Sequence, residues 1–223
     1  MQIKDKKIQI RRQRILFALA LLFLVCFSLL AAFRNAFASL NLGFNLWAAS
    51  INNESFTIVA TEISVVFDTT FIGVTSIVVS VILFLMNYKR FSLLVLSAMA
   101  GDALLVLFLK IIIMSQRPTN QILLETGYSF PSGHVTGCVV FFGVLTYIAW
   151  KRWNTLRAKA VTCGLYVATT AVVGFDRIYL NVHWFSDIVG GVFLGGFWLL
   201  LCFFVFEYLA FNQRSKFLRK GVS

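Results

Sequence analysis

The only two histidines of the chain, His134 and His183, lie in segments that also hold its other chemically active residue types. Asp187 follows His183 by four positions, so on a helix the two side chains share one face. A carboxylate there can accept the Nδ1 proton of the imidazole, which fixes the tautomer and leaves the Nε2 lone pair free. That is the orienting arrangement of a catalytic triad, here with the histidine as nucleophile. The simpler alternative is a local His–Asp pair that closes the start of a helix.

Three basic residues accompany the histidines: Lys110, Arg117 and Arg177. Lys110 and Arg117 are seven positions apart, about two helical turns, so both project from one helix face. A planar guanidinium suits bidentate binding of phosphate, which is the role we expect for Arg177. For Lys110 the simpler alternatives are a side chain that extends to the membrane interface, or an ion pair with Asp102.

The segment Pro131-Ser132-Gly133-His134 has the composition of a helix start. Serine is a favoured N-cap residue, and glycine allows another group to approach the backbone closely. The first turn of such a helix presents free N–H groups, which bind anions such as phosphate. The alternative is a capped helix start with an incidental histidine.

Together these side chains predict phosphoryl transfer. His183 would attack phosphorus in line, while the cations and the Gly133 backbone stabilise the oxygens on which charge develops. His134 would donate a proton to the leaving oxygen, and water would then release phosphate. The cations neutralise charge, so we expect no metal and no other cofactor. Two histidines and a carboxylate could bind zinc, but the surrounding cations would repel it.

The composition requires these residues to be positioned by membrane helices. With 59% hydrophobic and only 13% charged residues, the chain cannot cover a water-facing surface, which excludes a soluble enzyme. Stretches of this length in lipid must be helical. We therefore predict an all-α fold, an integral membrane bundle of six transmembrane helices forming a single domain, residues 1–223. The predicted spans are Ile15–Phe33, Thr69–Met86, Phe91–Leu109, Val135–Trp150, Ala160–Phe175 and Ile188–Phe206.

The basic residues predict the orientation of the bundle. Sixteen of the 20 lie on one side if the spans alternate, which makes that side, with both termini, cytoplasmic. Residues 1–14 then form a cytoplasmic basic tail, and no nucleic-acid partner is needed to explain the charge. Residues 34–68 form an outer segment of short amphipathic helices. The motif-bearing region, residues 110–187, converges on the outer face.

Four further features carry expectations. The first span resembles a signal sequence, but its apolar run is too long for one, which favours a retained anchor. The cysteines fall in apolar spans and are interpreted as small hydrophobic residues. Gly191 and Gly195 form a GxxxG pair that allows close helix packing. The outer loop Thr119–Phe130 contains three side chains that could select the lipid headgroup or could simply be solvated: Glu125, Tyr128 and Phe130.

The chain contains three motifs in this order: Lys-x6-Arg-Pro, Pro-Ser-Gly-His and Arg-x5-His-x3-Asp. Together they resemble the three-part signature of the type 2 phosphatidic acid phosphatase superfamily. The resemblance covers Lys110 to Asp187 by motif and the rest by the six-span layout. It implies a metal-independent membrane lipid phosphatase that works through a phosphohistidine, similar to bacterial phosphatidylglycerophosphate and undecaprenyl-diphosphate phosphatases. It implies that His183 is the nucleophile, Asp187 its partner and His134 the acid. The implied phosphate ligands are Lys110, Arg117, Ser132, Gly133 and Arg177.

Two departures from the family pattern stand out. The family usually has serine before the third-motif arginine, where this chain has Asp176, and an ionised carboxylate there would brace Arg177 instead of binding phosphate. Many bacterial relatives continue the first motif as Arg-Pro-Arg-Pro, where this chain has Thr119-Asn120 after Pro118. Both changes reduce positive charge at the site, which weakens the expectation of a diphosphate substrate.

The predicted partner is therefore a phosphorylated membrane lipid: phosphatidylglycerophosphate, phosphatidic acid or undecaprenyl diphosphate. Two alternatives remain. A lipid phosphotransferase would share the covalent half-reaction, and an anionic-lipid transporter would use the same cations, although the chain lacks the internal repeat typical of transporters. The predicted location is a cell membrane, with the active site on the extracytoplasmic side. The small size favours a bacterial source.

Overall fold

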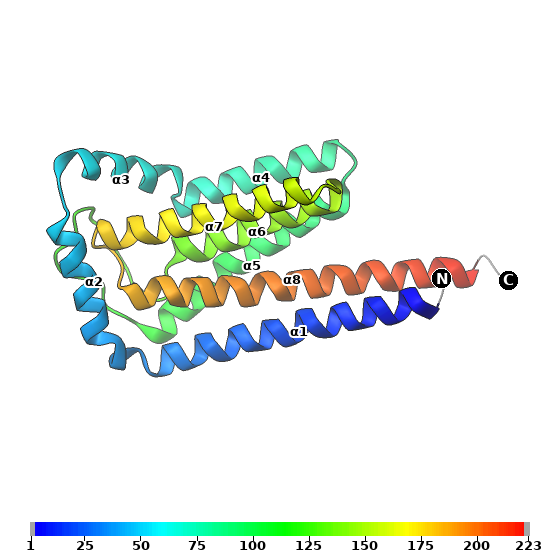
Figure 1. Ribbon diagram of the computed structural model, residues 1–223, viewed down its shortest axis with the longest axis horizontal. Coiled ribbons are helices and arrows are strands. Elements are labelled where there is room, and N and C mark those ends of the chain that lie inside the picture. Colours follow the sequence, from blue (N-terminus) through cyan, green and yellow to red (C-terminus); the bar gives the residue numbers. More distant parts are fainter. Residues whose placement is uncertain (1–2, 221–223) are drawn as a thin grey trace.

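The computed structural model describes residues 3–220, with side chains from 6 to 212, and every regular element in that part is a helix (Figure 1). The predicted all-α fold is confirmed. The order is α1 (Ile3–Ala32), the 3₁₀ helix η1 (Arg34–Phe37), α2 (Ala38–Ser50), α3 (Glu54–Val66), α4 (Thr69–Leu85), α5 (Lys89–Ile113), α6 (Gly133–Arg152), α7 (Leu156–Tyr179) and α8 (Phe185–Lys220).

The predicted spans coincide with helices, but the number of spans is less regular than predicted. In the described residues, five helices are long and apolar enough to cross a membrane: α1, α5, α6, α7 and α8. The stretch Thr69–Met86 forms α4, which has only 17 residues. It meets the same test together with α3, across a bend of 43°. Asp68 lies in that bend and caps α4, because its carboxylate accepts from Thr70 N at 2.8 Å.

The helices place the connections predicted to be cytoplasmic at one end of the bundle. The start of α1, the end of α8 and the α4–α5 and α6–α7 connections lie at that end (Figure 1). The other end holds the segment predicted to form short helices, which forms η1, α2 and α3. It also holds the loop between α5 and α6. This arrangement is the alternation that the charge pattern requires, and the sidedness itself stays a prediction.

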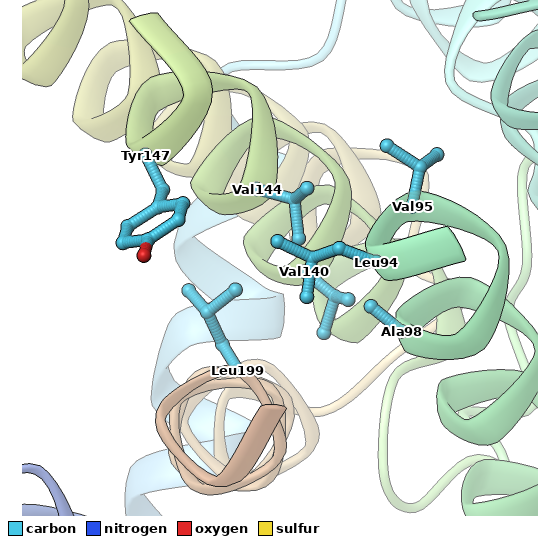
Figure 2. Close-up of a cluster of buried hydrophobic side chains, with 7 residues drawn as sticks. All are labelled: Leu94, Val95, Ala98, Val140, Val144, Tyr147 and Leu199. Atoms are coloured by element: carbon cyan, nitrogen blue, oxygen red, sulfur yellow. The ribbon is translucent and has the colours of Figure 1, made fainter. Parts of the chain in front are cut away.

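The core of the bundle joins the three helices that carry the motifs. Figure 2 shows apolar side chains of α5, α6 and α8 meeting between these helices. They are Leu94, Val95, Ala98, Val140, Val144, Tyr147 and Leu199. Many large apolar side chains on the outward faces of α1, α4 and α5 stay exposed, as expected of helices that face lipid. The buried contacts therefore fix the motif-bearing helices relative to one another.

At the end opposite the outer loops, Glu207 of α8 joins three helices. Its carboxylate pairs with Arg12 of α1 at 3.0 Å and with Lys151 of α6 at 2.9 Å. It also accepts hydrogen bonds from Tyr147 of α6 and, at 3.1 Å, from Gln9 of α1. The first helix is thus packed along α8 and attached to it at the end predicted to be cytoplasmic.

Glycine allows α8 to approach α6 closely, as the GxxxG pair predicts. A Cβ atom on Gly195 would lie 2.9 Å from Val139 Cβ and 3.2 Å from the carbonyl oxygen of Thr136. A Cβ on Gly191 would lie 3.0 Å from the carbonyl oxygen of Ser132, beside the second motif. These distances are shorter than nearly all Cβ contacts in real proteins, so the predicted close packing is confirmed.

We expect Gly195→Ala to destabilise the protein, because the added methyl group forces α6 and α8 apart. Overpacking of this kind costs about 1–3 kcal/mol. The matched control is Gly164→Ala on α7, where an added Cβ meets no atom within 4 Å. Thermal unfolding in detergent should show a lower Tm for Gly195→Ala only. Equal Tm values for the two variants would contradict the close-packing interpretation.

Candidate active site

The first motif lies where α5 ends. Met114 adopts left-handed backbone angles, with φ of 50°, and its N–H donates to the carbonyl oxygen of Lys110, so the helix stops after Ile113. Arg117 therefore lies beyond the helix, and the expectation that it shares a helix face with Lys110 is wrong. Lys110 Nζ donates to the carbonyl oxygen of Tyr128 at 2.7 Å, which holds its charge under the outer loop. The alternative ion pair with Asp102 is not formed among the described side chains, and Asp102 Oδ1 has no hydrogen-bond partner there.

The third motif forms a buried His–Asp pair. His183 Nδ1 lies 3.1 Å from Asp187 Oδ2, and neither side chain is more than 1% exposed. The same carboxylate oxygen accepts from Trp184 N at 2.9 Å, so it also stabilises the start of α8. Asp187 therefore orients the imidazole with Nδ1–H as donor and leaves Nε2 as the free nitrogen. Burial, then the positive charge of Arg117, lowers the pKa of His183 well below its usual value.

The second motif begins α6, but its serine does not cap the helix. Ser132 holds the N-cap position without a side-chain cap hydrogen bond, and its buried Oγ has no partner among the described residues. The expected side-chain cap is thus wrong, because no N–H group of the first turn donates to this hydroxyl. Thr136 N donates to the carbonyl oxygen of Ser132 at 3.0 Å, and the N–H groups before it in the first turn remain available to an anion.

Arg177 is fully buried and lies between two acidic groups. Its Nε donates to Asp176 Oδ2 at 3.0 Å, and its Nη2 donates to the same oxygen. Its Nη1 lies 2.8 Å from Glu125 Oε1 and 3.1 Å from His134 Nε2. The bracing of Arg177 by Asp176, which the sequence predicts, is confirmed.

Arg117 lies on the other side of Glu125. Its Nη1 lies 2.9 Å from Glu125 Oε2 and 3.4 Å from His183 Nε2. It also donates to the carbonyl oxygens of Val182, at 2.8 Å, and Gly127, at 3.2 Å. One carboxylate therefore bridges the two guanidinium groups, in the place where phosphate oxygens are expected.

The structure brings the predicted site residues together at one end of the bundle. The rings of His134 and His183 have centroids 6.5 Å apart, although 49 positions separate them in the chain. An open cleft of about 820 Å³ is lined by Lys110, Arg117, Gly133 and His134. A second, largely apolar cavity of about 550 Å³ shares Lys110 and Gly133 and extends between α4 and α5. The cleft can hold a headgroup while the cavity holds an apolar chain.

Two acidic residues lie closer to the histidines and arginines than the sequence predicts. Asp68 Oδ2 lies 3.7 Å from His134 Nε2, and the Asp-Thr-Thr helix start before an apolar run is the only sign of it in the sequence. Glu125 is predicted as a possible headgroup selector, but it pairs directly with both arginines. The sequence feature that indicates this pairing is that Glu125 is the single carboxylate in an outer loop that lies beside three cations.

A metal ion does not suit these donors. Glu125, His134 and His183 offer ligand atoms within 4.8 Å of one another. However, the Nε2 atom of each histidine faces a guanidinium group, at 3.1 Å for His134 and 3.4 Å for His183. A divalent cation bound there would lie beside two fixed positive charges, so the donor set favours an anion.

Comparison with known proteins identifies relatives of this chain. Residues 91–211 match the family model described as the PAP2 superfamily. Phosphatidylglycerophosphatase B of Bacillus subtilis is 34% identical over 130 residues, which cover 57% of this chain and 61% of that protein. An undecaprenyl-diphosphatase of Sulfolobus acidocaldarius is 31% identical over 94 residues, covering 39% and 41%. The alignments thus span less than two thirds of these relatives' own length.

Solved structures share the fold. The crystal structure of the PAP2 type phosphatidylglycerolphosphate phosphatase from Bacillus subtilis has a TM-score of 0.78 and 26% identity, over 88% of this chain and 96% of that one. The structure of Aquifex aeolicus LpxE has a TM-score of 0.55 and 22% identity, over 74% and 94%. The second likeness shows the fold alone.

We expect Ser132→Ala to leave the stability unchanged or slightly raised, since its buried hydroxyl has no hydrogen bond to lose among the described residues. The matched control is Ser129→Ala, whose hydroxyl donates to the carbonyl oxygens of Ser115 and Gln116 at 3.2 and 3.0 Å. That variant should lose about 1 kcal/mol. Thermal unfolding in detergent measures both, and a clear loss of Tm in Ser132→Ala would show that the hydroxyl has a structural partner.

Proposed function

Since the chain belongs to the PAP2 superfamily, we propose that it is a membrane lipid phosphatase that works through a phosphohistidine without a metal ion. One observation carries the proposal. His183 and His134 present their Nε2 atoms toward Arg117 and Arg177 respectively, and Asp187 orients His183 from behind. This is the geometry needed for a nucleophile and an acid on either side of a bound phosphoryl group.

In the first step, the phosphoryl group binds between the two arginines, in the place held by Glu125 in the free protein. Lys110, the Ser132 hydroxyl and the first-turn N–H groups at Gly133 supply further donors. His183 Nε2 attacks phosphorus and forms the P–N bond as the P–O bond to the lipid breaks. His134 donates its proton to the leaving oxygen.

In the second step, water attacks the phosphorus of the phosphohistidine. The P–N bond breaks and its electron pair returns to His183 Nε2. His134, which lost its proton in the first step, accepts one from the water. The products are orthophosphate and a lipid alcohol, or a lipid monophosphate if the substrate is a diphosphate.

We propose a lipid phosphate monoester of the phosphatidylglycerophosphate type as the preferred substrate. The names of the Bacillus subtilis relatives support this choice. The replacement of a further cation by Thr119-Asn120 supports it too, because a diphosphate would bring more negative charge to the site. The apolar cavity between α4 and α5 offers a place for the lipid chain. The distribution of basic residues supports a location in the cell membrane, with the site on the outer face and both termini cytoplasmic.

His183→Ala should lower phosphate release by roughly a thousandfold or more, because it removes the proposed nucleophile that forms the covalent intermediate. The assay uses purified protein in detergent with EDTA and the three candidate lipids, and no acceptor other than water. Trapping labelled phosphate on the wild-type protein, but not on the variant, would identify the intermediate. Full phosphate release by the variant would overturn the mechanism, and release only with an added acceptor alcohol would indicate a transferase.

The acid limb of kcat/KM should lie below about pH 6.5, because His183 attacks in its neutral form and its pKa is lowered. Arg117→Gln removes one cause of that lowering, so the limb should move to higher pH. Substrate ionisation affects both proteins equally and cancels in the comparison. A pH profile with the same acid limb in both proteins would show that Arg117 does not control the protonation of His183.

A further inference from the structure

Glu125 stands out because no step of the proposed reaction uses it, although it makes close contacts to both phosphate-binding arginines. Its two oxygens lie 2.8 Å from Arg177 Nη1 and 2.9 Å from Arg117 Nη1. Oε1 also lies 3.8 Å from His134 Nε2. A carboxylate with one oxygen on each guanidinium occupies the position of two phosphoryl oxygens.

Glu125 is not needed to hold either arginine in place. Arg177 donates twice to Asp176, and Arg117 donates to the backbone oxygens of Gly127 and Val182. Both guanidinium groups therefore keep fixed partners when Glu125 leaves. The single negative charge of the carboxylate instead reduces the repulsion between two positive charges that would otherwise face each other in a partly buried site.

The surroundings of Glu125 give its side chain room to leave. Leu123, Leu124 and Thr126 line the open cleft beside it, and Leu124 is 85% exposed. The loop itself is attached elsewhere: Ile122 N donates to the carbonyl oxygen of Leu180 at 2.9 Å. A rotation of the Glu125 side chain into the cleft would open the site without breaking that attachment.

We propose that Glu125 is an internal anion that occupies the phosphate site between turnovers and competes with orthophosphate, the product. The inference rests on the proposed phosphatase function. An internal competitor weakens the binding of every anion by the same factor. A lipid substrate also gains binding energy from its apolar chain, whereas orthophosphate does not. Competition with Glu125 therefore weakens the binding of orthophosphate and favours its release, while the lipid substrate still binds.

The test is isothermal titration of orthophosphate into the full-length protein in detergent. If Glu125 occupies the site in about nine of ten molecules, Glu125→Gln should lower the Kd of orthophosphate about tenfold. Glu125→Ala, which leaves no side-chain oxygen, should lower it at least as much. The matched control is Glu62→Gln, which changes an exposed carboxylate on α3 and should leave the Kd unchanged.

An unchanged or higher Kd in both Glu125 variants would overturn the proposal and make Glu125 a supporting residue. The titration does not depend on turnover, so its result is separate from the phosphatase assay. If the wild-type protein released phosphate from no lipid, the proposed function would fail whatever the titration showed. In an active protein, the inhibition constant of orthophosphate should fall by the same factor in Glu125→Gln.

Discussion

The site depends on pairing the buried positive charge of Arg177 with a carboxylate. This side chain is fully buried, and an unpaired charge there would be very costly. Asp176 pairs with it from the neighbouring position, so the guanidinium keeps a fixed place whether or not Nη1 has a ligand. The family usually has serine at that position. In this chain a carboxylate, which holds Arg177 in place, replaces a hydroxyl that could donate a hydrogen bond to phosphate. The Nη1 group then remains the part of Arg177 that can meet an anion.

The bundle supports this arrangement by fixing three helix ends relative to one another. Lys110 lies in the last turn of α5, Ser132 precedes α6, and His183 precedes α8. The apolar cluster in Figure 2 holds α5, α6 and α8 together. The short contacts at Gly191 and Gly195 bring α8 against the start of α6, and Ser132 N donates to the carbonyl oxygen of Asp187 at 3.1 Å. The second and third motifs therefore share a backbone contact, which limits their relative movement.

Much of this could be predicted from the sequence, because apolar length and basic residues follow simple rules in a membrane. The positions of His134, His183 and Lys110 at helix ends follow from where the apolar stretches stop. The position of Glu125 does not follow from such rules, because a loop without periodicity does not show which side chains turn inward; the only sign of it is that Glu125 is the single carboxylate of that loop. The uncapped state of Ser132 is also beyond sequence rules, which assign serine at that position to capping. The 43° bend between α3 and α4 is not described by hydropathy, which measures the length of an apolar stretch and not its direction.

The charge balance of the site gives an electrostatic reason for the acid role that we propose for His134. In the free protein, three cations (Lys110, Arg117 and Arg177) meet three carboxylates (Glu125, Asp176 and Asp187), and a fourth carboxylate, Asp68, lies 3.7 Å from His134 Nε2, so the site carries no net positive charge. In the proposed reaction a dianionic phosphoryl group replaces Glu125, so the site gains one net negative charge. A proton on His134 offsets that added charge, and Arg177 Nη1, which lies 3.1 Å from His134 Nε2 in the free protein, then has the phosphoryl oxygen as its acceptor. Binding of the dianion would thus favour the protonated form of His134, which the proposed transfer of a proton to the leaving oxygen requires.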